Sequence, residues 1–350
     1  MSDLERAHEA IRAVDPGGML DAVNEMPNHI RDALWRIESA RLHSMEAPAA
    51  IVCGMGGSAI GGELAIAALG DRISKPMITV RGYELPSWSP AGSAVLCSSY
   101  SGNTEETLAG YAAAEALGAQ RLVATTGGQL AEKARGDGVP VIGLPAGLRP
   151  RAAVAYMVCS AFELAALSLA APRVATELDA AATHLFERKE AIAERALRLA
   201  EEVGDATPVI YGSDLTAPIS YRWKCQVNEN AKLPAFSAVL PEADHNELEG
   251  WTGALDHGSF ACLLLDDRDQ HPRERQRIQL TADLIGPSAS SVARVEADGE
   301  TRTARLFELV MMGDLLSLHL AARHGVDPSA MPRIDEMKDR LGPPGSASQG

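Results

Sequence analysis

Short apolar runs alternate with helix-length segments along most of the chain. Five runs in the first half are apolar on both faces and end in turns rich in glycine or serine, as buried parallel strands do. The same rhythm returns in the second half with four more runs. The pattern predicts an α/β protein with two parallel sheets flanked by helices. The expected strands are 49–53, 77–80, 94–97, 121–124, 139–142, 208–211, 235–240, 259–265 and 291–295.

Helical periodicity fills the segments around these strands. Two helical patterns precede the first strand, separated by Asp15-Pro16-Gly17-Gly18. An alanine-rich stretch and a charged stretch connect the halves, and two helices close the chain. The helices are expected over 3–46, 152–171, 175–202, 303–324 and 329–341. The domains are expected as N-terminal helices (1–47), a first α/β domain (48–150), connecting helices (151–204), a second α/β domain with C-terminal helices (205–342) and a disordered tail (343–350) rich in Gly, Pro and Ser.

Composition narrows the classes of protein that fit this pattern. The chain has 350 residues, 46% of them hydrophobic, which is enough for two domains with a sizeable core. A net charge of −15 without a basic patch disfavours nucleic acid and anionic membranes as partners. Ser160, Glu163 and Ser168 interrupt the alanine-rich stretch, which favours a buried helix over a membrane span. The polar N-terminus and five scattered cysteines predict a cytoplasmic protein with reduced thiols.

A glycine-rich turn follows the first expected strand and opens a helix. Its residues Gly56, Gly57 and Ser58 are expected to bind a small polar ligand, because backbone N–H groups and the helix dipole favour an anion there. A dinucleotide site would need an acidic residue about 20 positions on, and the sequence offers Thr79-Val80-Arg81 there. A tight turn needed only for packing stays open as the alternative.

A serine-rich loop follows the third expected strand and also opens a helix. Ser99, Ser101 and Thr104 can each donate a hydrogen bond, and Gly102 lets backbone N–H groups turn toward the same point. This arrangement suits the oxygens of a phosphate monoester. A helix-capping cluster is the alternative interpretation. The turn at 125–128 is expected to join the same rim at the carboxyl ends of the strands.

These loops belong to six motifs that occur in order through nearly the whole chain. The motifs are GMGGSAIGG at 54–62, SSYSGNTEET at 98–107, PRAAVAY at 150–156, NENAK at 228–232, HNE at 245–247 and a C-terminal DP...I...K..L pattern ending at Lys338 and Leu341. With them the chain resembles the sugar isomerase (SIS) domain proteins, and more closely the bifunctional phosphoglucose/phosphomannose isomerase family. The resemblance implies two SIS subdomains of the doubly wound, flavodoxin-like kind, a sugar-phosphate substrate and a homodimer with an active site shared between subunits.

Moving a proton between C1 and C2 of an open-chain sugar needs one base, and a partly desolvated carboxylate suits this role. Glu229, flanked by two asparagines near a helix end, is the candidate that the resemblance also implies; a surface glutamate is the alternative. His245 suits opening of the sugar ring, and the resemblance suggests that it acts from the neighbouring subunit. Lys338 resembles the lysine of the family that assists ring opening or steadies the enediolate.

Arg151 resembles the active-site arginine of the family, which could stabilise the enediolate oxygens, and Arg149 is a close alternative. His245, Glu247 and His257 lack the spacing of a helical metal-ligand pair, and enediol chemistry by a carboxylate needs no metal. We therefore expect neither a metal nor a cofactor. The tryptophans at 223 and 251 are expected to pack rather than to bind ligand.

The sequence thus predicts an aldose–ketose isomerase that interconverts glucose 6-phosphate, and also mannose 6-phosphate, with fructose 6-phosphate through a cis-enediol. A non-catalytic SIS protein that binds a sugar phosphate and acts through partners is a second hypothesis. Loss of the base, the histidine or the lysine would mark it, and all three candidates are present. An isomerase of an amino sugar phosphate is a third.

Overall fold

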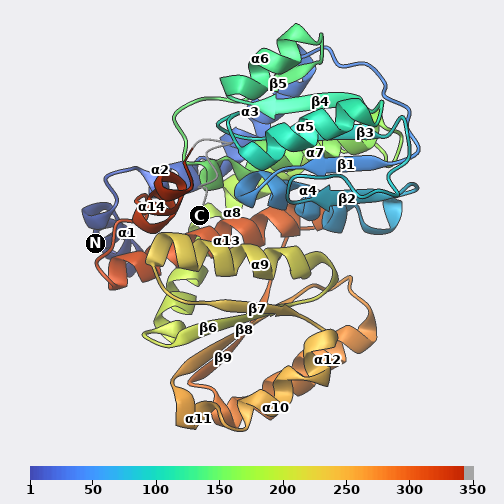
Figure 1. The fold of residues 1–350 in the computed structure, drawn as a ribbon. Helices are drawn as coiled ribbons and strands as arrows, with labels where there is room; N and C mark the ends of the chain where they lie inside the picture. The colour runs from blue at the N-terminus through green and yellow to red at the C-terminus, as the bar shows by residue number, and fades with distance from the viewer. Residues whose placement is uncertain (343–350) are drawn as a thin grey trace, which may run out of the picture.

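A computed structural model of the chain describes residues 1–342. Two parallel β-sheets lie on opposite sides of a helical layer (Figure 1). This arrangement confirms the predicted α/β class with two sheets. The tail predicted to be disordered, 343–350, lies outside the described residues.

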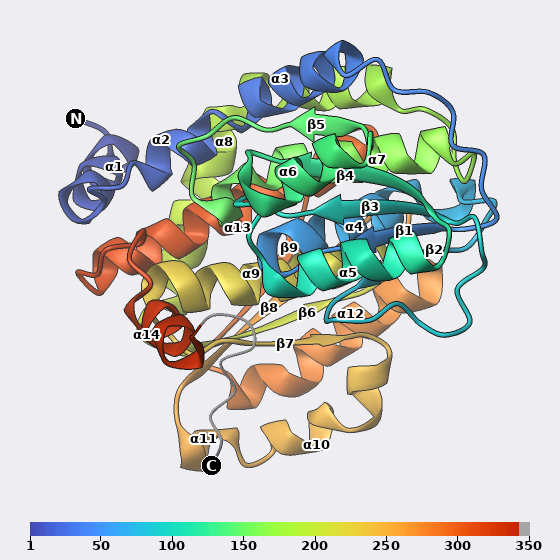
Figure 2. The ribbon, with the colours of Figure 1, turned by 45° about the horizontal axis from the view of Figure 1, so that its top comes forward.

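The first sheet has the strand order β2-β1-β3-β4-β5, with every neighbouring pair parallel. Alternate strand residues point to opposite faces, so Ile51 and Val95 pack against α5 and α6, whereas Val52 and Leu96 face α4 and α7. Figure 2 shows α5 and α6 on the outer face. The elements are β1 Ala50–Cys53, α4 Gly56–Leu69, β2 Met77–Val80, β3 Ala94–Ser98, α5 Glu105–Ala116, β4 Gln120–Thr125, α6 Gly128–Gly136, β5 Val141–Gly143 and α7 Val154–Leu167.

The second sheet repeats this order without a fifth strand among the described residues, as β7-β6-β8-β9. All its pairs are parallel as well. All nine strand predictions are therefore confirmed to within a few residues at their ends. The elements are β6 Thr207–Gly212, α9 Ala217–Gln226, β7 Phe236–Val239, α10 Glu247–Trp251, α11 Ala254–His257, β8 Phe260–Asp266, α12 Pro272–Ile285 and β9 Ser291–Glu296.

Helix α13, Arg302–Arg323, runs between the two sheets and is buried along nearly its whole length. Its N-cap Thr301 accepts a hydrogen bond from the backbone N–H of Ala304 at 3.1 Å, which satisfies one of the unpaired donors of the first turn. Leucine, methionine and alanine dominate the helix, and all three favour helical conformation. It packs against α8, Ala175–Val203, and α9. Helix α13 is therefore the shared core of both halves.

The N-terminal segment forms three helices where the sequence predicted two. They are α1 Asp3–Val14, α2 Met19–Asn24 and α3 Met26–Ser39. The second predicted helix divides at Glu25 because Pro27 lies in the first turn of α3, where the missing N–H of proline is tolerated. The Asp15 carboxylate accepts hydrogen bonds from the backbone N–H groups of Met19 and Leu20, both at 2.9 Å, which fixes the start of α2.

The alanine-rich stretch forms a core helix. Residues Pro150–Leu167 are apolar enough to cross a membrane by length and composition, yet 89% of the stretch is buried inside the protein. It begins with a 3₁₀ turn, Pro150–Ala153, and continues as α7. The final helix, α14 Pro332–Leu341, starts three residues later than predicted and buries none of its side chains. Its place beside the end of α13 is visible in Figures 1 and 2.

Gly313 on α13 allows the closest approach between α13 and α9. Trp223 is fully buried there, as predicted, and its indole Nε1 donates to the Leu309 carbonyl oxygen at 2.8 Å. A Cβ at position 313 would lie 2.1 Å from Nε1 of Trp223. The Gly313→Ala variant should lower the free energy of unfolding by about 1–3 kcal/mol or more, because a rigid ring must shift.

Denaturant unfolding of Gly313→Ala beside Gly136→Ala tests this requirement. Gly136 also lies in a helix, but a Cβ there would meet nothing within 4 Å. We expect Gly136→Ala to stay within about 0.5 kcal/mol of the parent or to stabilise it, since alanine is the better helix former. Equal stabilities for the two variants would contradict the packing argument.

Candidate active site

The carboxyl ends of β1 and β3 form the switch point of the first sheet, where neighbouring strands lead to opposite faces and ligands bind in such folds. The glycine-rich turn follows β1 and the serine-rich loop follows β3. A Cβ at Gly54 would lie 2.9 Å from the Ser98 carbonyl oxygen, so the two loops are in direct contact. Both predicted ligand-binding loops therefore share one edge of the sheet.

Two helices begin at this edge without a capping side chain. The N-cap residues are Met55 for α4 and Thr104 for α5, and neither side chain caps its helix. The first-turn N–H groups of a helix carry partial positive charge and have no partner within the helix. The Thr104 hydroxyl instead lies 2.8 Å from the Ser99 hydroxyl, which disfavours the capping interpretation of the serine-rich loop. The arrangement favours an anion between the two helix ends.

The hydroxyl groups of the loop are held by its own backbone. The Ser99 hydroxyl accepts from the Gly102 N–H at 3.1 Å, and the Ser101 hydroxyl accepts from the Asn103 N–H at 3.2 Å. Ser99 is buried, whereas Ser101 is exposed at the rim. Gly102 has a φ of +69°, and a Cβ there would lie 1.9 Å from the Gly127 carbonyl oxygen. Only glycine therefore allows the turn after β4 to close against this loop.

Arg151 lies beside the glycine-rich turn. A Cβ at Gly57 would be 3.1 Å from the Pro150 carbonyl oxygen and 3.4 Å from Cα of Arg151, so a small residue is needed there. The Arg151 side chain is buried, and burial lowers the pKa of its guanidinium while the Glu229 carboxylate opposes that shift. Arg149 is exposed, so the structure favours Arg151 as the arginine of this site.

Glu229 lies on a π-helical turn, Val227–Ala231, that continues α9. Such turns are rare and occur often at functional sites. Its carboxylate is 31% exposed and lies 3.6 Å from Nη1 of Arg151. The amides on either side of Glu229 do not bind its carboxylate. Asn228 donates to the Leu233 carbonyl oxygen at 2.7 Å, and Asn230 accepts from Nε of Arg151 at 2.6 Å.

Glu229 lines a small cavity between α9 and the first turns of α4. The cavity has a volume of about 40 Å³. Gly56, Gly57, Arg151 and Glu229 lie on its wall, so the structure brings four of the predicted site residues together. Ser58, Ser99, Ser101 and Thr104 lie along the adjoining edge of the first sheet, on the loops described above.

Two site residues were not predicted from the sequence. Arg222 and Gln226 line the same cavity and share the buried carboxylate of Asp314 on α13, at 2.6 Å and 2.8 Å. Burial raises the pKa of Asp314, and the Arg222 guanidinium opposes that shift. One feature of the sequence could have indicated them. Arg222 and Gln226 precede Glu229 by seven and three residues, a spacing that places all three on one side of a helix.

His245 and Lys338 are not brought to Glu229 within one chain. Glu229 precedes β7 and His245 follows it, in an exposed 3₁₀ turn. Strand β7 alone spans on the order of 13 Å at about 3.3 Å per residue. Lys338 is exposed on α14, and no hydrogen bond or ion pair within residues 1–342 joins its ammonium to Glu229 or Arg151. The chain does pass the site before α14, because the Pro328 carbonyl oxygen accepts a hydrogen bond from Nη2 of Arg151.

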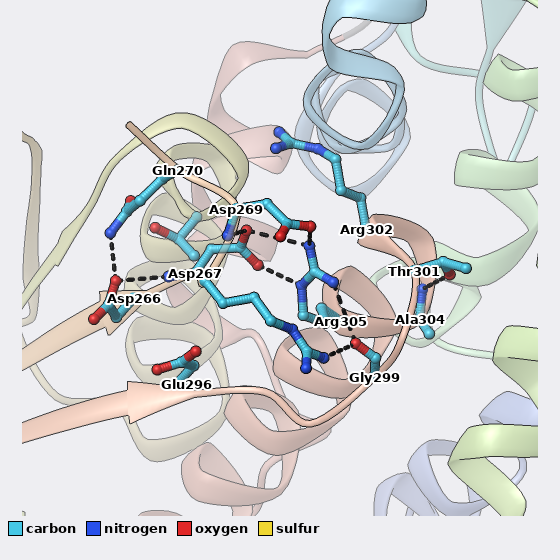
Figure 3. Close-up of polar contacts among 12 residues, drawn as sticks. Asp266, Asp267, Asp269, Gln270, Glu296, Gly299, Thr301, Arg302, Ala304 and Arg305 are labelled. Atoms are coloured by element: carbon cyan, nitrogen blue, oxygen red, sulfur yellow. Dashed lines mark hydrogen bonds and ion pairs between the residues drawn. The ribbon is translucent and has the colours of Figure 1, made fainter. Parts of the chain in front are cut away.

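The carboxyl edge of the second sheet carries aspartates, and these are already paired with Arg305. Figure 3 shows the Arg305 guanidinium between Asp267 and Asp269, in the loop that follows β8. Nε of Arg305 donates to Asp267 at 2.6 Å, and its Nη1 donates to the Gly299 carbonyl oxygen at 3.2 Å. An anion there would meet carboxylates instead of free donors. The first sheet therefore offers the more favourable edge for an anion.

His245, Glu247 and His257 do not form a metal site within the described chain. Glu247 accepts a hydrogen bond from the Tyr211 hydroxyl at 2.8 Å. Across residues 1–342, no group of three or more His, Cys, Asp or Glu side chains is placed to hold a metal ion. The tryptophan at 251 is buried, and its Nε1 donates to Tyr211 at 3.0 Å, in keeping with the predicted packing role.

Two parallel sheets with a hydroxyl-rich loop at one switch point, and a carboxylate paired with a buried arginine beside it, are the features of a sugar-phosphate isomerase of the SIS class. Residues 192–341 match the bacterial phospho-glucose isomerase C-terminal SIS domain. The chain is 37% identical over 336 residues to the bifunctional phosphoglucose/phosphomannose isomerase of Caldicellulosiruptor bescii, covering 92% of this chain and 98% of that protein. The chain belongs to the bifunctional phosphoglucose/phosphomannose isomerase family.

Further comparisons agree with this assignment. The enzyme of the same name from Aquifex aeolicus is 34% identical over 292 residues, which cover 83% of this chain and 89% of that one. Among solved structures, the C-terminal domain of glucosamine-fructose-6-phosphate aminotransferase from Francisella tularensis has a TM-score of 0.71 at 12% identity and covers 89% of this chain and 97% of that one. At that identity, the second likeness concerns the fold alone.

Gly102→Ala should displace the serine-rich loop in addition to straining the backbone at position 102. Gly118 has nearly the same φ, +68°, but a Cβ there would meet nothing within 4 Å. In both variants, an alanine in the left-handed region lowers the free energy of unfolding by about 1–2 kcal/mol. Only Gly102→Ala also displaces the turn after β4. We expect Gly102→Ala to raise KM for a sugar phosphate about tenfold or more, because the lost contacts are hydrogen bonds to a charged group.

Steady-state kinetics of the two variants, each checked for folding by circular dichroism, provide the measurement. Gly118→Ala should keep the parental KM. The role of the loop in binding would be disproved by equal KM values for the two folded variants.

Proposed function

We propose that this protein interconverts glucose 6-phosphate and mannose 6-phosphate with fructose 6-phosphate. The observation that carries the proposal is the partly exposed Glu229 carboxylate beside Arg151, in a cavity that adjoins two uncapped helix ends. The helix ends and the hydroxyls of the serine-rich loop would bind the phosphate. The sugar would extend from there toward Glu229.

The reaction needs one proton to move between adjacent carbons. Glu229 would take the proton from C2 of the open-chain aldose and return it to C1 to give the ketose, while the hydroxyl proton at O2 passes to O1 through the cis-enediol. Arg151 lies 3.6 Å from the Glu229 carboxylate and would balance negative charge that develops on the sugar oxygens. Glucose and mannose phosphates differ only at C2, so both give the same enediol.

Ring opening requires a proton donor and acceptor at the ring oxygen and O1. His245 lies beyond β7 from Glu229 of its own chain, so we assign it to the site of a second copy in a homodimer. The exposed apolar side chains Phe236 and Val239 on the edge strand β7 support a partner on that side of the protein. Lys338 would reach the site by a movement of α14, which buries no side chain in its present position.

The competing hypotheses have less support. A binding module without catalysis would leave no reason for a carboxylate held in a cavity by a buried arginine. An amino sugar phosphate as substrate draws support from the D-glucosamine-6-phosphate 4-epimerase of Sulfolobus acidocaldarius, which is 30% identical over 70% of this chain, so glucosamine 6-phosphate is a useful comparison substrate. We also place the protein in the cytoplasm, because its five cysteines are free thiols, as is usual in reducing compartments. We assign it no nucleic-acid or membrane partner.

Glu229→Gln should lower kcat by about a hundredfold to ten-thousandfold, since the amide keeps the shape of the side chain but removes the base. Glu249→Gln is the matched control, because Glu249 is exposed and outside the site. A coupled assay for fructose 6-phosphate from glucose 6-phosphate, mannose 6-phosphate and glucosamine 6-phosphate measures the effect. Near-parental turnover by Glu229→Gln would remove this residue from the mechanism.

A mixed dimer tests the shared site. Chains with Glu229→Gln and chains with His245→Ala are co-expressed with different tags, and the doubly tagged dimer is purified. If His245 acts across the interface, one of the two sites has both groups intact, and the mixed dimer should regain about half of the parental activity. Activity no higher than that of either parent dimer would place His245 outside the partner's site.

A further inference from the structure

One buried donor at the cavity has no partner in the described chain. Nε of Arg222 has almost no exposed surface, and no hydrogen-bond acceptor within residues 1–342 contacts it. The whole side chain is only 3% exposed. Arg222 nevertheless lines the cavity that contains Glu229 and Gly57. A buried N–H group of a cation without an acceptor is costly, and the place of Arg222 in the wall of the cavity that Glu229 lines makes a substrate atom the candidate partner.

The rest of the Arg222 side chain is fixed. Its Nη2 donates to the Asp314 carboxylate at 2.6 Å and to the Arg151 carbonyl oxygen at 3.0 Å. Asp314 is fully buried and also accepts from Gln226 at 2.8 Å. Charge-assisted bonds of this length orient a planar guanidinium firmly. The direction of the Nε–H bond is therefore set before a substrate binds.

The second arginine of the cavity is engaged differently. Each of the three nitrogens of Arg151 already contacts a protein oxygen: Nε contacts Asn230, Nη1 contacts Glu229 and Nη2 contacts Pro328. Arg151 therefore positions the catalytic turn and neutralises its carboxylate. Of the two guanidiniums, Arg222 is the one whose Nε–H is left for substrate.

We propose that Arg222 is a second cationic substrate-binding residue, whose Nε–H donates a hydrogen bond to the sugar oxygen at C1 or C2. This inference rests on the proposed isomerase function. Arg222 and Glu229 lie on the same side of one helix and line the same cavity, away from the serine-rich loop. The hydrogen bond strengthens as that oxygen gains negative charge in the enediolate, so it favours the transition state over the bound sugar.

Two ligands separate charge recognition from general binding. Arabinonate 5-phosphate ends in a carboxylate that imitates the enediolate, whereas sorbitol 6-phosphate offers only hydroxyls. Arg222→Lys keeps a cation beside Asp314 but has no Nε–H group. We expect this variant to lose about 10- to 100-fold in affinity for arabinonate 5-phosphate, as for a hydrogen bond to a charged group, and to bind sorbitol 6-phosphate within about threefold of the parent.

Arg305→Lys is the matched control, because Arg305 is another buried arginine paired with an aspartate, in the acidic edge shown in Figure 3. It should leave both affinities unchanged. A second test variant, Arg222→Gln with Asp314→Asn, removes both charges of the buried pair without leaving one charge alone, and the new amide at 314 can still accept the hydrogen bond from Gln226. It should show the same selective loss, with folding checked by circular dichroism.

Isothermal titration calorimetry on the full-length proteins gives the affinities. Unchanged affinity for arabinonate 5-phosphate in both Arg222 variants, or an equal loss for both ligands, would overturn the proposal and leave Arg222 with a structural role. If the parent protein isomerises sugar phosphates and either of these overturning results is obtained, the inference about Arg222 fails and the proposed function stands. A parent that binds the acid through Arg222 but isomerises no sugar would contradict the proposed function alone, and a parent that binds neither ligand would contradict both.

Discussion

The buried carboxylate of Asp314 is the constraint on which the site depends. It lies on α13, the helix that both halves of the protein share, and it orients Arg222 and Gln226 of α9. One turn further on, Ser317 accepts from the Asn230 amide at 2.8 Å, and Asn230 in turn holds Arg151. Arg222 also reaches the backbone of Arg151 directly. A single core helix thus fixes groups from both halves around Glu229, and the energetic cost of burying a carboxylate is offset by its two partners.

The two sheets share a topology but differ in the chemistry of their carboxyl edges. The first edge presents hydroxyls, glycines and two helix N-termini without capping side chains, whereas the second presents carboxylates already paired with Arg305. In the proposed mechanism, the helix N-termini of the first edge would bind the phosphate, and side chains from α9 and the turn after it would act on the sugar.

The sequence predicted the fold well because short apolar runs that end in glycine or serine have few alternatives to a buried parallel strand. It also predicted the loops that reach the switch point and the carboxylate of the site. The partners of Asp314 escaped prediction: the spacing of Arg222 and Gln226 before Glu229 places them on one side of a helix, but it does not indicate that Asp314 will lie against that side. The break at Glu25 was missed because a proline two positions later ends one helix pattern and begins another with the same periodicity. Where His245 and Lys338 act depends on contacts between chains or elements, which no local pattern encodes.

Solvent hydrogen exchange tests the central claim, proton transfer by a partly exposed carboxylate, most directly. Fructose 6-phosphate is converted in D2O, and deuterium at C2 of the glucose 6-phosphate formed is measured by NMR at low conversion. Because the Glu229 side chain is 31% exposed, a proton held on it can exchange with solvent before it returns to the sugar. The account predicts deuterium at C2. Product without any deuterium at C2, as a direct hydride shift between the two carbons would give, would contradict it.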